Sequence, residues 1–278
     1  MDLPTTLKLI SMEVGNPKFE NFFRILASSR VKYIIICPGA LDREALMDMP
    51  LNFANILPPL PYGQDTWNTA HISRNAATGK LEFELSAREM AGISNVWHPT
   101  LVDFLHLQKI KSMGLYVQLC TLTPDSTNDL PNSTGEKMIA KMARFEWEIR
   151  YIARETLAYQ LLHGTGIGPR VLGQIHEQGR VIGILLEKVR GRRAGIGDLP
   201  QCLAALKSLH NMRILHGDCN RHNFIVGSDG EVTLIDFSEF KENATDEELL
   251  AEEGSLAGQL EDASGLGDYG VLEEDGDN

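Results

Sequence analysis

Cysteine is scarce in this chain, and the few cysteines lie far apart. The 278 residues contain four of them, Cys37, Cys120, Cys202 and Cys219. They do not form the closely spaced pairs that hold zinc, and their density is too low for a small domain held together by disulfides. The sequence therefore predicts reduced thiols and excludes a zinc-ribbon or disulfide scaffold.

Long apolar runs are also absent. The opening segment, MDLPTTLKLISME, has no basic stretch followed by an apolar run of about seven to fifteen residues. No segment approaches the roughly 18 apolar residues that a membrane-spanning helix requires. We therefore expect a protein of the cytoplasm or nucleus without a membrane partner.

Basic residues are too few and too scattered for a nucleic-acid-binding surface. Lys and Arg total 26 against 38 Asp and Glu, and the short run Arg190, Arg192 and Arg193 is the one basic cluster that stands out. Residues 242–278 hold thirteen acids and no Lys or Arg, which leaves 25 acids and 26 bases in residues 1–241. No nucleic-acid partner is expected. Residues 265–278 are predicted to be a disordered acidic tail because they offer little apolar surface.

The first sixty residues predict a β-rich extension. Residues 31–37 form an apolar run closed by Pro-Gly, which is typical of a strand. Residues 19–26 fit either a helix or an aromatic-rich strand. Residues 57–63, LPPLPYG, must be extended, because each proline fixes its own backbone and restricts the residue before it. This segment predicts a domain boundary at residue 60.

The rest of the chain predicts a mixture of hairpins and helices with no internal repeat. Strands are expected within 104–110, 115–122, 137–142, 171–176, 180–189, 224–226 and 233–236, with a polar loop at 123–136. Helices are expected at 146–162 and 199–209, and the leucines of 246–262 favour a last helix that packs on the body. The chain is thus expected to be α+β.

The most informative segment is LHGDCNRHNFIV, residues 215–226, followed by LIDFS at 234–238. Asp218, Asn223 and Asp236 form an ordered set in which a short hairpin returns the second carboxylate beside the first. Such a set fits a phosphoryl-transfer site, where one carboxylate orients the attacking hydroxyl and an amide and a second carboxylate hold the metal on the phosphates. Each residue alone could be a polar turn residue. His216 is expected to brace the loop rather than to bind metal.

These residues resemble the protein-kinase-like superfamily, in particular its aminoglycoside-phosphotransferase-like and RIO-like branches, where Gly replaces Arg in the His-Arg-Asp motif. Residues 57–262 are similar to kinase-like proteins of fungi, through segments such as WHP at 97–99 and HGD at 216–218. The resemblance implies ATP and Mg²⁺ as cofactors. Asp218 would be catalytic, whereas Asn223 and Asp236 would hold the metal and nucleotide.

The resemblance also implies a lysine on the third strand and a carboxylate on the following helix. Lys141 fits the first role, since such a lysine points into the cleft to reach the phosphates. Glu155 is the preferred partner and Glu148 the second choice; seven residues separate them, about two helical turns, so both could face the same side. The strand that ends near Glu187 and Val189 resembles the connection between two kinase lobes, where backbone groups would bind adenine.

Three departures from the kinase pattern stand out. A Gly-x-Gly-x-x-Gly loop is missing between the first two strands of the kinase-like region, where KSMG at 111–114 offers one glycine. The Asp-Phe-Gly motif appears as Asp236-Phe237-Ser238. No Ala-Pro-Glu follows, and about forty residues remain after Ser238. An activation segment is therefore not expected, and a docking surface for peptide substrates is in doubt.

We accordingly predict a two-lobed protein-kinase-like fold with an N-terminal β-rich extension and a minimal C-terminal lobe. The expected parts are the extension at 1–60, an N-lobe at 61–189, a reduced C-lobe at 190–264 and the tail at 265–278. The favoured function is transfer of the γ-phosphoryl group of ATP to a hydroxyl of a protein or small molecule. The alternative is a pseudokinase, a nucleotide-binding interaction module without catalysis.

Overall fold

The computed structural model describes residues 6–126, 130 and 135–262 and divides into two compact units, Met1–Met90 and Ala91–Asn278. The predicted tail at 265–278 and part of the predicted loop at 123–136 lie outside the described residues. Both units combine strands with helices, so the structure is α+β, as predicted. None of the described helices is long and apolar enough to cross a membrane.

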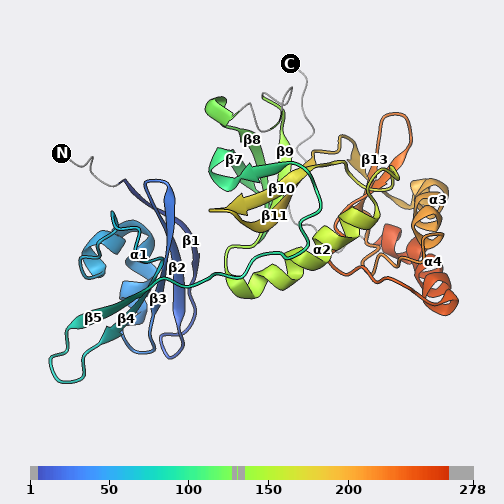
Figure 1. The fold of residues 1–278 in the computed structure, drawn as a ribbon. Helices are drawn as coiled ribbons and strands as arrows, with labels where there is room; N and C mark the ends of the chain where they lie inside the picture. The colour runs from blue at the N-terminus through green and yellow to red at the C-terminus, as the bar shows by residue number, and fades with distance from the viewer. Residues whose placement is uncertain (1–5, 127–129, 131–134, 263–278) are drawn as a thin grey trace, which may run out of the picture. The chain divides into compact units, whose positions relative to one another are not determined.

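The first unit is a five-stranded sheet with one helix (Figure 1). Its strands lie in the order β1 (Leu7–Glu13), β2 (Asn21–Ala27), β3 (Arg30–Ile36), β4 (Thr69–Arg74) and β5 (Leu81–Ser86). Neighbouring strands are antiparallel except β3 and β4, which run parallel and are joined through helix α1 (Arg43–Ile56). The β-rich character is confirmed, and of the two options for residues 19–26 the strand is the observed one.

The boundary predicted at residue 60 was wrong. Strand β4 pairs with β3 from Tyr33↔Thr69 to Ile36↔Ile72, and β5 pairs with β4, so both strands belong to the first sheet. The proline-rich segment is an internal connection between α1 and β4. The division therefore falls after Met90.

The second unit contains a six-stranded sheet with a helix packed against it (Figure 1). Its order is β6 (Leu101–Asp103), β10 (Val171–Glu177), β11 (Arg180–Glu187), β9 (Met138–Met142), β8 (Val117–Leu122) and β7 (Leu107–Ser112). All pairs are antiparallel except β6 with β10. Helix α2 (Ile149–Leu161) follows a short 3₁₀ turn at Glu146–Glu148 and buries Ile149 and Ile152 in the core with this sheet.

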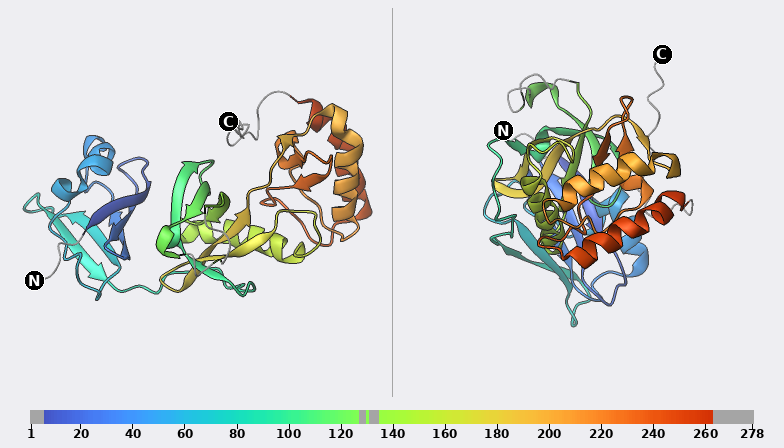
Figure 2. Two further views of the ribbon diagram at one scale, coloured as in Figure 1. Left: turned by 90° about the horizontal axis from the view of Figure 1, so that it is seen from above. Right: turned by 90° about the vertical axis from the view of Figure 1, so that its right-hand side faces the viewer.

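The remaining part of the second unit contains two helices and a small sheet. Helices α3 (Leu199–His210) and α4 (Asp246–Glu261) lie side by side (Figure 2), next to a small sheet of β12 (Arg192–Arg193), β13 (Phe224–Val226) and β14 (Val232–Leu234). Thr245 caps α4 by accepting the N–H of Glu248. The predicted packing of this last helix is confirmed, since Leu249, Leu256 and Leu260 are buried.

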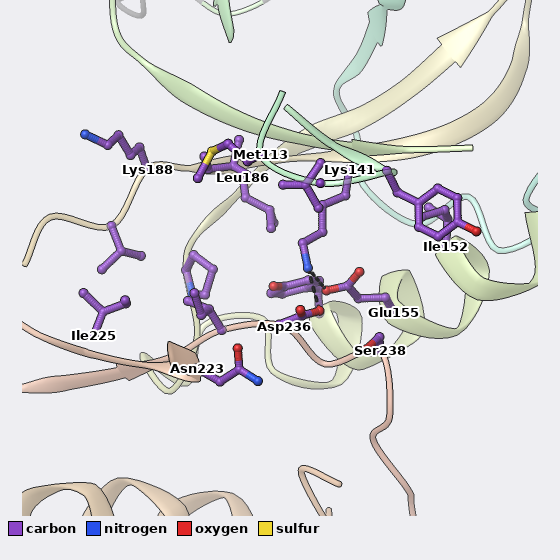
Figure 3. Close-up of a pocket in the computed structure, with 18 of the residues that line it drawn as sticks. Met113, Lys141, Ile152, Glu155, Leu186, Lys188, Asn223, Ile225, Asp236 and Ser238 are labelled. Atoms are coloured by element: carbon purple, nitrogen blue, oxygen red, sulfur yellow. Dashed lines mark hydrogen bonds and ion pairs between the residues drawn. The ribbon is translucent and has the colours of Figure 1, made fainter. Parts of the chain in front are cut away.

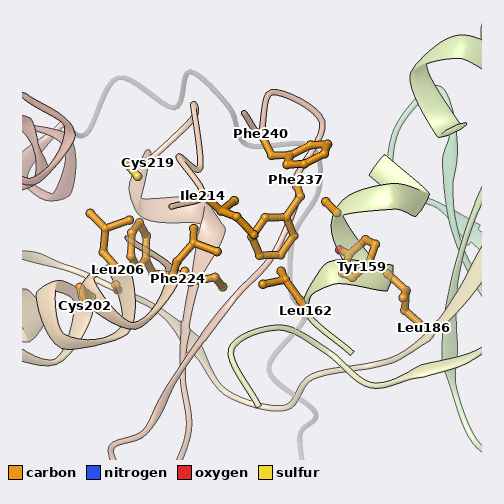
Figure 4. Packing of buried hydrophobic residues seen from close by; sticks show 14 of the residues in the cluster. Tyr159, Leu162, Leu186, Cys202, Leu206, Ile214, Cys219, Phe224, Phe237 and Phe240 are labelled. Carbon is orange, nitrogen blue, oxygen red and sulfur yellow. The ribbon is translucent and has the colours of Figure 1, made fainter. Parts of the chain in front are cut away.

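One apolar core joins these elements to α2. Figure 4 shows Tyr159 of α2 and Leu162, which follows this helix, facing Phe237, with Phe224 and Leu206 beyond it. The rings of Tyr159 and Phe237 meet edge to face, with centroids 5.4 Å apart. The segment that follows β14 is therefore fixed against α2 by the aromatic side chain next to Asp236.

Candidate functional site

A pocket of about 520 Å³ opens in the second unit, and its size is in the range of small-molecule sites. Figure 3 shows Leu186 and Ile225 toward one end of it and Lys141, Glu155 and Asp236 toward the other. The pocket thus offers apolar side chains at one end, where Lys188 also lies, and the Lys141, Glu155 and Asp236 cluster at the other. Six of the seven predicted site residues line it, namely Lys141, Glu155, Glu187, Val189, Asn223 and Asp236.

Lys141 lies on β9 and directs its ammonium group between two carboxylates. Its Nζ lies 2.5 Å from Oε1 of Glu155 and 2.9 Å from Oδ1 of Asp236. Burial by itself would lower the pKa of Lys141, but the two carboxylates outweigh it and raise the pKa. The lysine is therefore charged and holds helix α2 to the segment after β14.

Glu155 is the carboxylate that pairs with Lys141, in agreement with the preferred choice. Burial raises the pKa of Glu155 although Lys141 opposes this. The 2.5 Å contact and a 3.3 Å bond from the Phe237 N–H favour the ionised carboxylate. The second choice, Glu148, faces elsewhere and accepts hydrogen bonds from Arg144.

Asp236 occupies a backbone conformation that is uncommon for a residue with a side chain. Its φ of 63° lies in the left-handed region, where a non-glycine residue is strained unless its surroundings hold it. Burial acts to raise the pKa of its carboxyl group, but Lys141 outweighs burial and lowers it. Asp236 is therefore an ionised carboxylate aimed into the pocket.

Asn223 and Asp218 are joined on the loop that precedes β13. The amide nitrogen of Asn223 donates to the backbone carbonyl of Asp218 at 2.9 Å and to its Oδ2 at 3.0 Å, while Asn220 donates to Oδ1 at 2.9 Å. Because its nitrogen is engaged, Asn223 turns its amide oxygen into the pocket, as Figure 3 shows. Asp218 stands behind Asn223 and is not among the residues that line the pocket.

His216 braces the loop that carries Asp218, as the sequence indicated, and connects it to the segment that carries Asp236. Its Nδ1 accepts the N–H of Asp218 at 3.3 Å, so the hydrogen must be on Nε2, which lies 3.1 Å from the Ile235 carbonyl. Burial lowers the pKa of His216 and keeps the ring neutral. The buried imidazole thus fixes the Asp218 loop relative to the residue before Asp236.

Glu252 of α4 also holds the Asp218 loop, and sequence reasoning missed it. Its carboxylate accepts the N–H of Gly217 at 2.7 Å and that of His216 at 3.1 Å. A third contact, of 2.7 Å, joins it to Nε2 of His210 on α3. Glu252 therefore links the last helix to the loop that carries Asp218.

His210 lies between two carboxylates and gives the fold a pH-dependent contact. Burial would lower its pKa, but Glu252 at 2.7 Å and Glu253 at 3.0 Å outweigh burial and raise it. This contribution to stability is full below the unfolded-state pKa of about 6.5 and disappears as the pH rises through the higher folded-state value. We expect His210→Gln to lose more free energy of unfolding, relative to wild type, at about pH 6 than at about pH 9. Urea denaturation at both pH values measures this, and an equal loss would contradict it.

Gly217 is required by a close backbone approach. Its φ is +83°, and a Cβ added there would lie 2.3 Å from the Glu239 carbonyl oxygen. Gly230, with φ of +84°, has open space around the same position and is a matched control. We expect Gly217→Ala to cost at least about 2 kcal/mol more unfolding free energy than Gly230→Ala in urea denaturation, because only the former adds a clash to the backbone strain. Equal losses would show that the loop moves aside without cost.

The adenine contact predicted near Glu187 and Val189 would not use the N–H of Glu187. Its N–H donates to the Arg170 carbonyl at 3.0 Å, and its carboxylate accepts the Arg170 N–H at 2.8 Å. The Glu187 N–H is therefore not available to a ligand, although Glu187 and Val189 both line the pocket. A ligand would use other backbone groups of 187–189.

The oxygen atoms of Asn223 and Asp236 are the groups that could hold a metal. Within the part of the chain that the structure describes, no three or more His, Cys, Asp and Glu side chains group in a way that could hold an ion by themselves. Mg²⁺ is usually held by one or two carboxylates together with substrate phosphates and water. The donor set therefore fits magnesium that arrives with a nucleotide. A comparison with protein-family models and with curated proteins found no match.

Proposed function

We propose that the second unit is a two-lobed protein-kinase-like fold that binds ATP with Mg²⁺ and transfers the γ-phosphoryl group to a hydroxyl. The observation that carries this proposal is the contact of Lys141 with both Glu155 and Asp236 in one pocket with Asn223. The six-stranded sheet and α2 would form one lobe, and the small sheet with α3 and α4 the reduced second lobe.

The two ends of the pocket support a nucleotide as the ligand. Apolar side chains such as Ile139, Leu186 and Ile225 provide surface for a base. The ammonium of Lys141 suits phosphate oxygens, and its existing pairing with Asp236 would have to open when they enter. Magnesium held by Asn223 and Asp236 would neutralise charge on the phosphates.

Asp218 would orient the acceptor hydroxyl. In the transfer, the acceptor oxygen forms a bond to the γ-phosphorus as the bond from that phosphorus to the β-bridging oxygen breaks. ADP leaves, and the hydroxyl proton passes to the Asp218 carboxylate. Asn220 and Asn223 fix both oxygens of this carboxylate, which defines its direction.

A pseudokinase is the second candidate, and one observation favours it. Asp218 is absent from the pocket wall, and both its oxygens accept hydrogen bonds from asparagine side chains. A binding module would need Lys141 and Asp236 for nucleotide but would not need Asp218 to meet an acceptor.

Thermal denaturation with ATP alone, Mg²⁺ alone and both together tests the proposal. A ligand that binds the native protein raises its Tm by mass action. We expect the largest rise with both ligands, together with slow release of phosphate from ATP when water acts as acceptor. An unchanged Tm would refute nucleotide binding. A rise in Tm without release of phosphate, and without transfer of labelled phosphate from ATP to protein, would favour the pseudokinase.

A further inference from the structure

The turn between β7 and β8 covers part of the pocket without the glycines that usually make such a loop close on phosphate. Residues 113–117 all line the pocket, and Gly114 is the single glycine among them. Two N–H groups of the turn, those of Met113 and Gly114, donate to the Val117 carbonyl at 2.9 and 3.2 Å. The turn is thus internally bonded, but these bonds do not fix its position over the pocket.

An aromatic pair supplies an attachment to α2. The ring of Tyr116 stacks on that of Tyr151, with centroids 6.4 Å apart and planes inclined by 20°. These values are typical of an offset aromatic pair. On its own helix, Tyr151 is also contacted by Arg150, whose guanidinium lies 4.6 Å from the ring centroid and donates to the Tyr151 hydroxyl at 2.6 Å. The guanidinium of Arg150 thus packs on the ring that Tyr116 meets, and this packing does not require the hydroxyl.

The Tyr116–Tyr151 pair lies where the β7–β8 turn, strand β9 and helix α2 meet. Tyr116 accepts the N–H of Met142 at 3.0 Å through its carbonyl, directly after Lys141 on β9. Tyr151 precedes Glu155 by one helical turn, and both residues line the pocket. A displacement of the turn would therefore shift the Lys141–Glu155 pair, and a displacement of that pair would shift the turn.

We infer that Tyr116 and Tyr151 are a positioning pair that holds the β7–β8 turn over the phosphate end of the pocket, in place of a glycine-rich loop. This inference rests on the proposed function for its ligand, ATP with Mg²⁺. A turn that is fixed before the nucleotide arrives loses less conformational freedom on binding, so the pair increases affinity without touching the reacting atoms.

The test compares Tyr151→Ala with Tyr151→Phe, which keeps the ring and removes only the hydroxyl. We expect Tyr151→Ala to raise the Kd for ATP with Mg²⁺ about two- to tenfold, as an aromatic pair of this kind allows. Tyr151→Phe should stay within about twofold of wild type. Tyr116→Ala should weaken binding similarly, and the double alanine variant should be no worse than either single variant because the contact is already lost.

Amide hydrogen exchange of residues 112–117 in the nucleotide-free protein provides a readout that needs no ligand. Exchange should accelerate in Tyr151→Ala and remain as in wild type in Tyr151→Phe. Unchanged exchange in Tyr151→Ala, or additive losses of affinity in the double variant, would overturn the inference. If wild type binds no nucleotide, the proposed function fails, and the exchange rates still decide whether Tyr151 orders the turn.

Discussion

Asp236→Asn is expected to abolish the additional rise in Tm that Mg²⁺ gives to ATP. The carboxylate of Asp236 is ionised, because Lys141 keeps its pKa low against burial, and it faces the pocket beside the Asn223 amide. An uncharged amide at this position binds a hard cation much more weakly than a carboxylate does. Thermal denaturation with ATP, with and without Mg²⁺, measures the effect against the Tm of the unliganded variant.

Asp218→Asn is the matched control for that result. Asp218 does not line the pocket, and Asn223 keeps its 2.9 Å bond to the backbone carbonyl of residue 218 in this variant, so the nucleotide-dependent rise in Tm should stay close to that of wild type. Phosphoryl transfer should fall by about 10²- to 10⁴-fold, the usual contribution of a group that accepts the proton of the attacking hydroxyl. Equal loss of nucleotide affinity in both variants would contradict the division of roles.

Lys141→Met is expected to destabilise the protein by about 3–5 kcal/mol, because it leaves two carboxylates without their shared cation. The side chain of Glu155 is 5% exposed and that of Asp236 is 27% exposed, so water can compensate only in part. Lys109→Met on the exposed face of β7 is the control and should change the free energy of unfolding by less than about 0.5 kcal/mol.

The deficit of Lys141→Met should shrink as the pH falls. Burial already raises the pKa of Glu155, and removal of the ammonium raises it further. The folded variant then binds a proton that the unfolded chain releases, so its stability rises toward lower pH. Urea denaturation at about pH 5 and pH 8 measures this, and a deficit that does not change with pH would show that Lys141 does not compensate the charge of Glu155.

The strands and helices that carry the site could be predicted because their sequences repeat local patterns. The apolar face of α2, and the short apolar runs of β10 and β11 on either side of a Gln-Gly turn, mark these elements without knowledge of their partners. The elements of the first unit were harder to predict from the sequence. Strand β5, LEFELS, alternates apolar and polar residues and could have been predicted from that pattern, although it was missed. Pro50 inside α1 obscured the helix, and the pairing of β4 with β3 depends on contacts that no local pattern reports.

In the candidate site, too, residues that belong to a local sequence motif could be predicted, whereas a residue defined by long-range contacts could not. Asp236 was predicted from its place after Asp218 and Asn223, and Lys141 and Glu155 were predicted through the resemblance. The distances between the three side chains agree with the expected convergence. Glu252 could not be predicted, because a glutamate within an acidic segment has no signature that distinguishes a buried carboxylate from a solvated one. The role of Glu252 follows only from the N–H groups of His216 and Gly217, which the fold places beside its carboxylate.

Paramagnetic broadening by Mn²⁺, used in place of Mg²⁺, tests the central claim most directly. In a nuclear magnetic resonance spectrum of the full chain, the account predicts broadening of the Asn223 side-chain amide and of the backbone amides next to Asp236 when ATP and Mn²⁺ are both present. Mn²⁺ alone should leave these signals sharp, since no three or more His, Cys, Asp and Glu side chains of the described residues group into a site that could hold an ion without the nucleotide. Broadening confined to the acidic residues of α4, or none at the Asn223 amide with both ligands present, would contradict a metal–nucleotide site in this pocket.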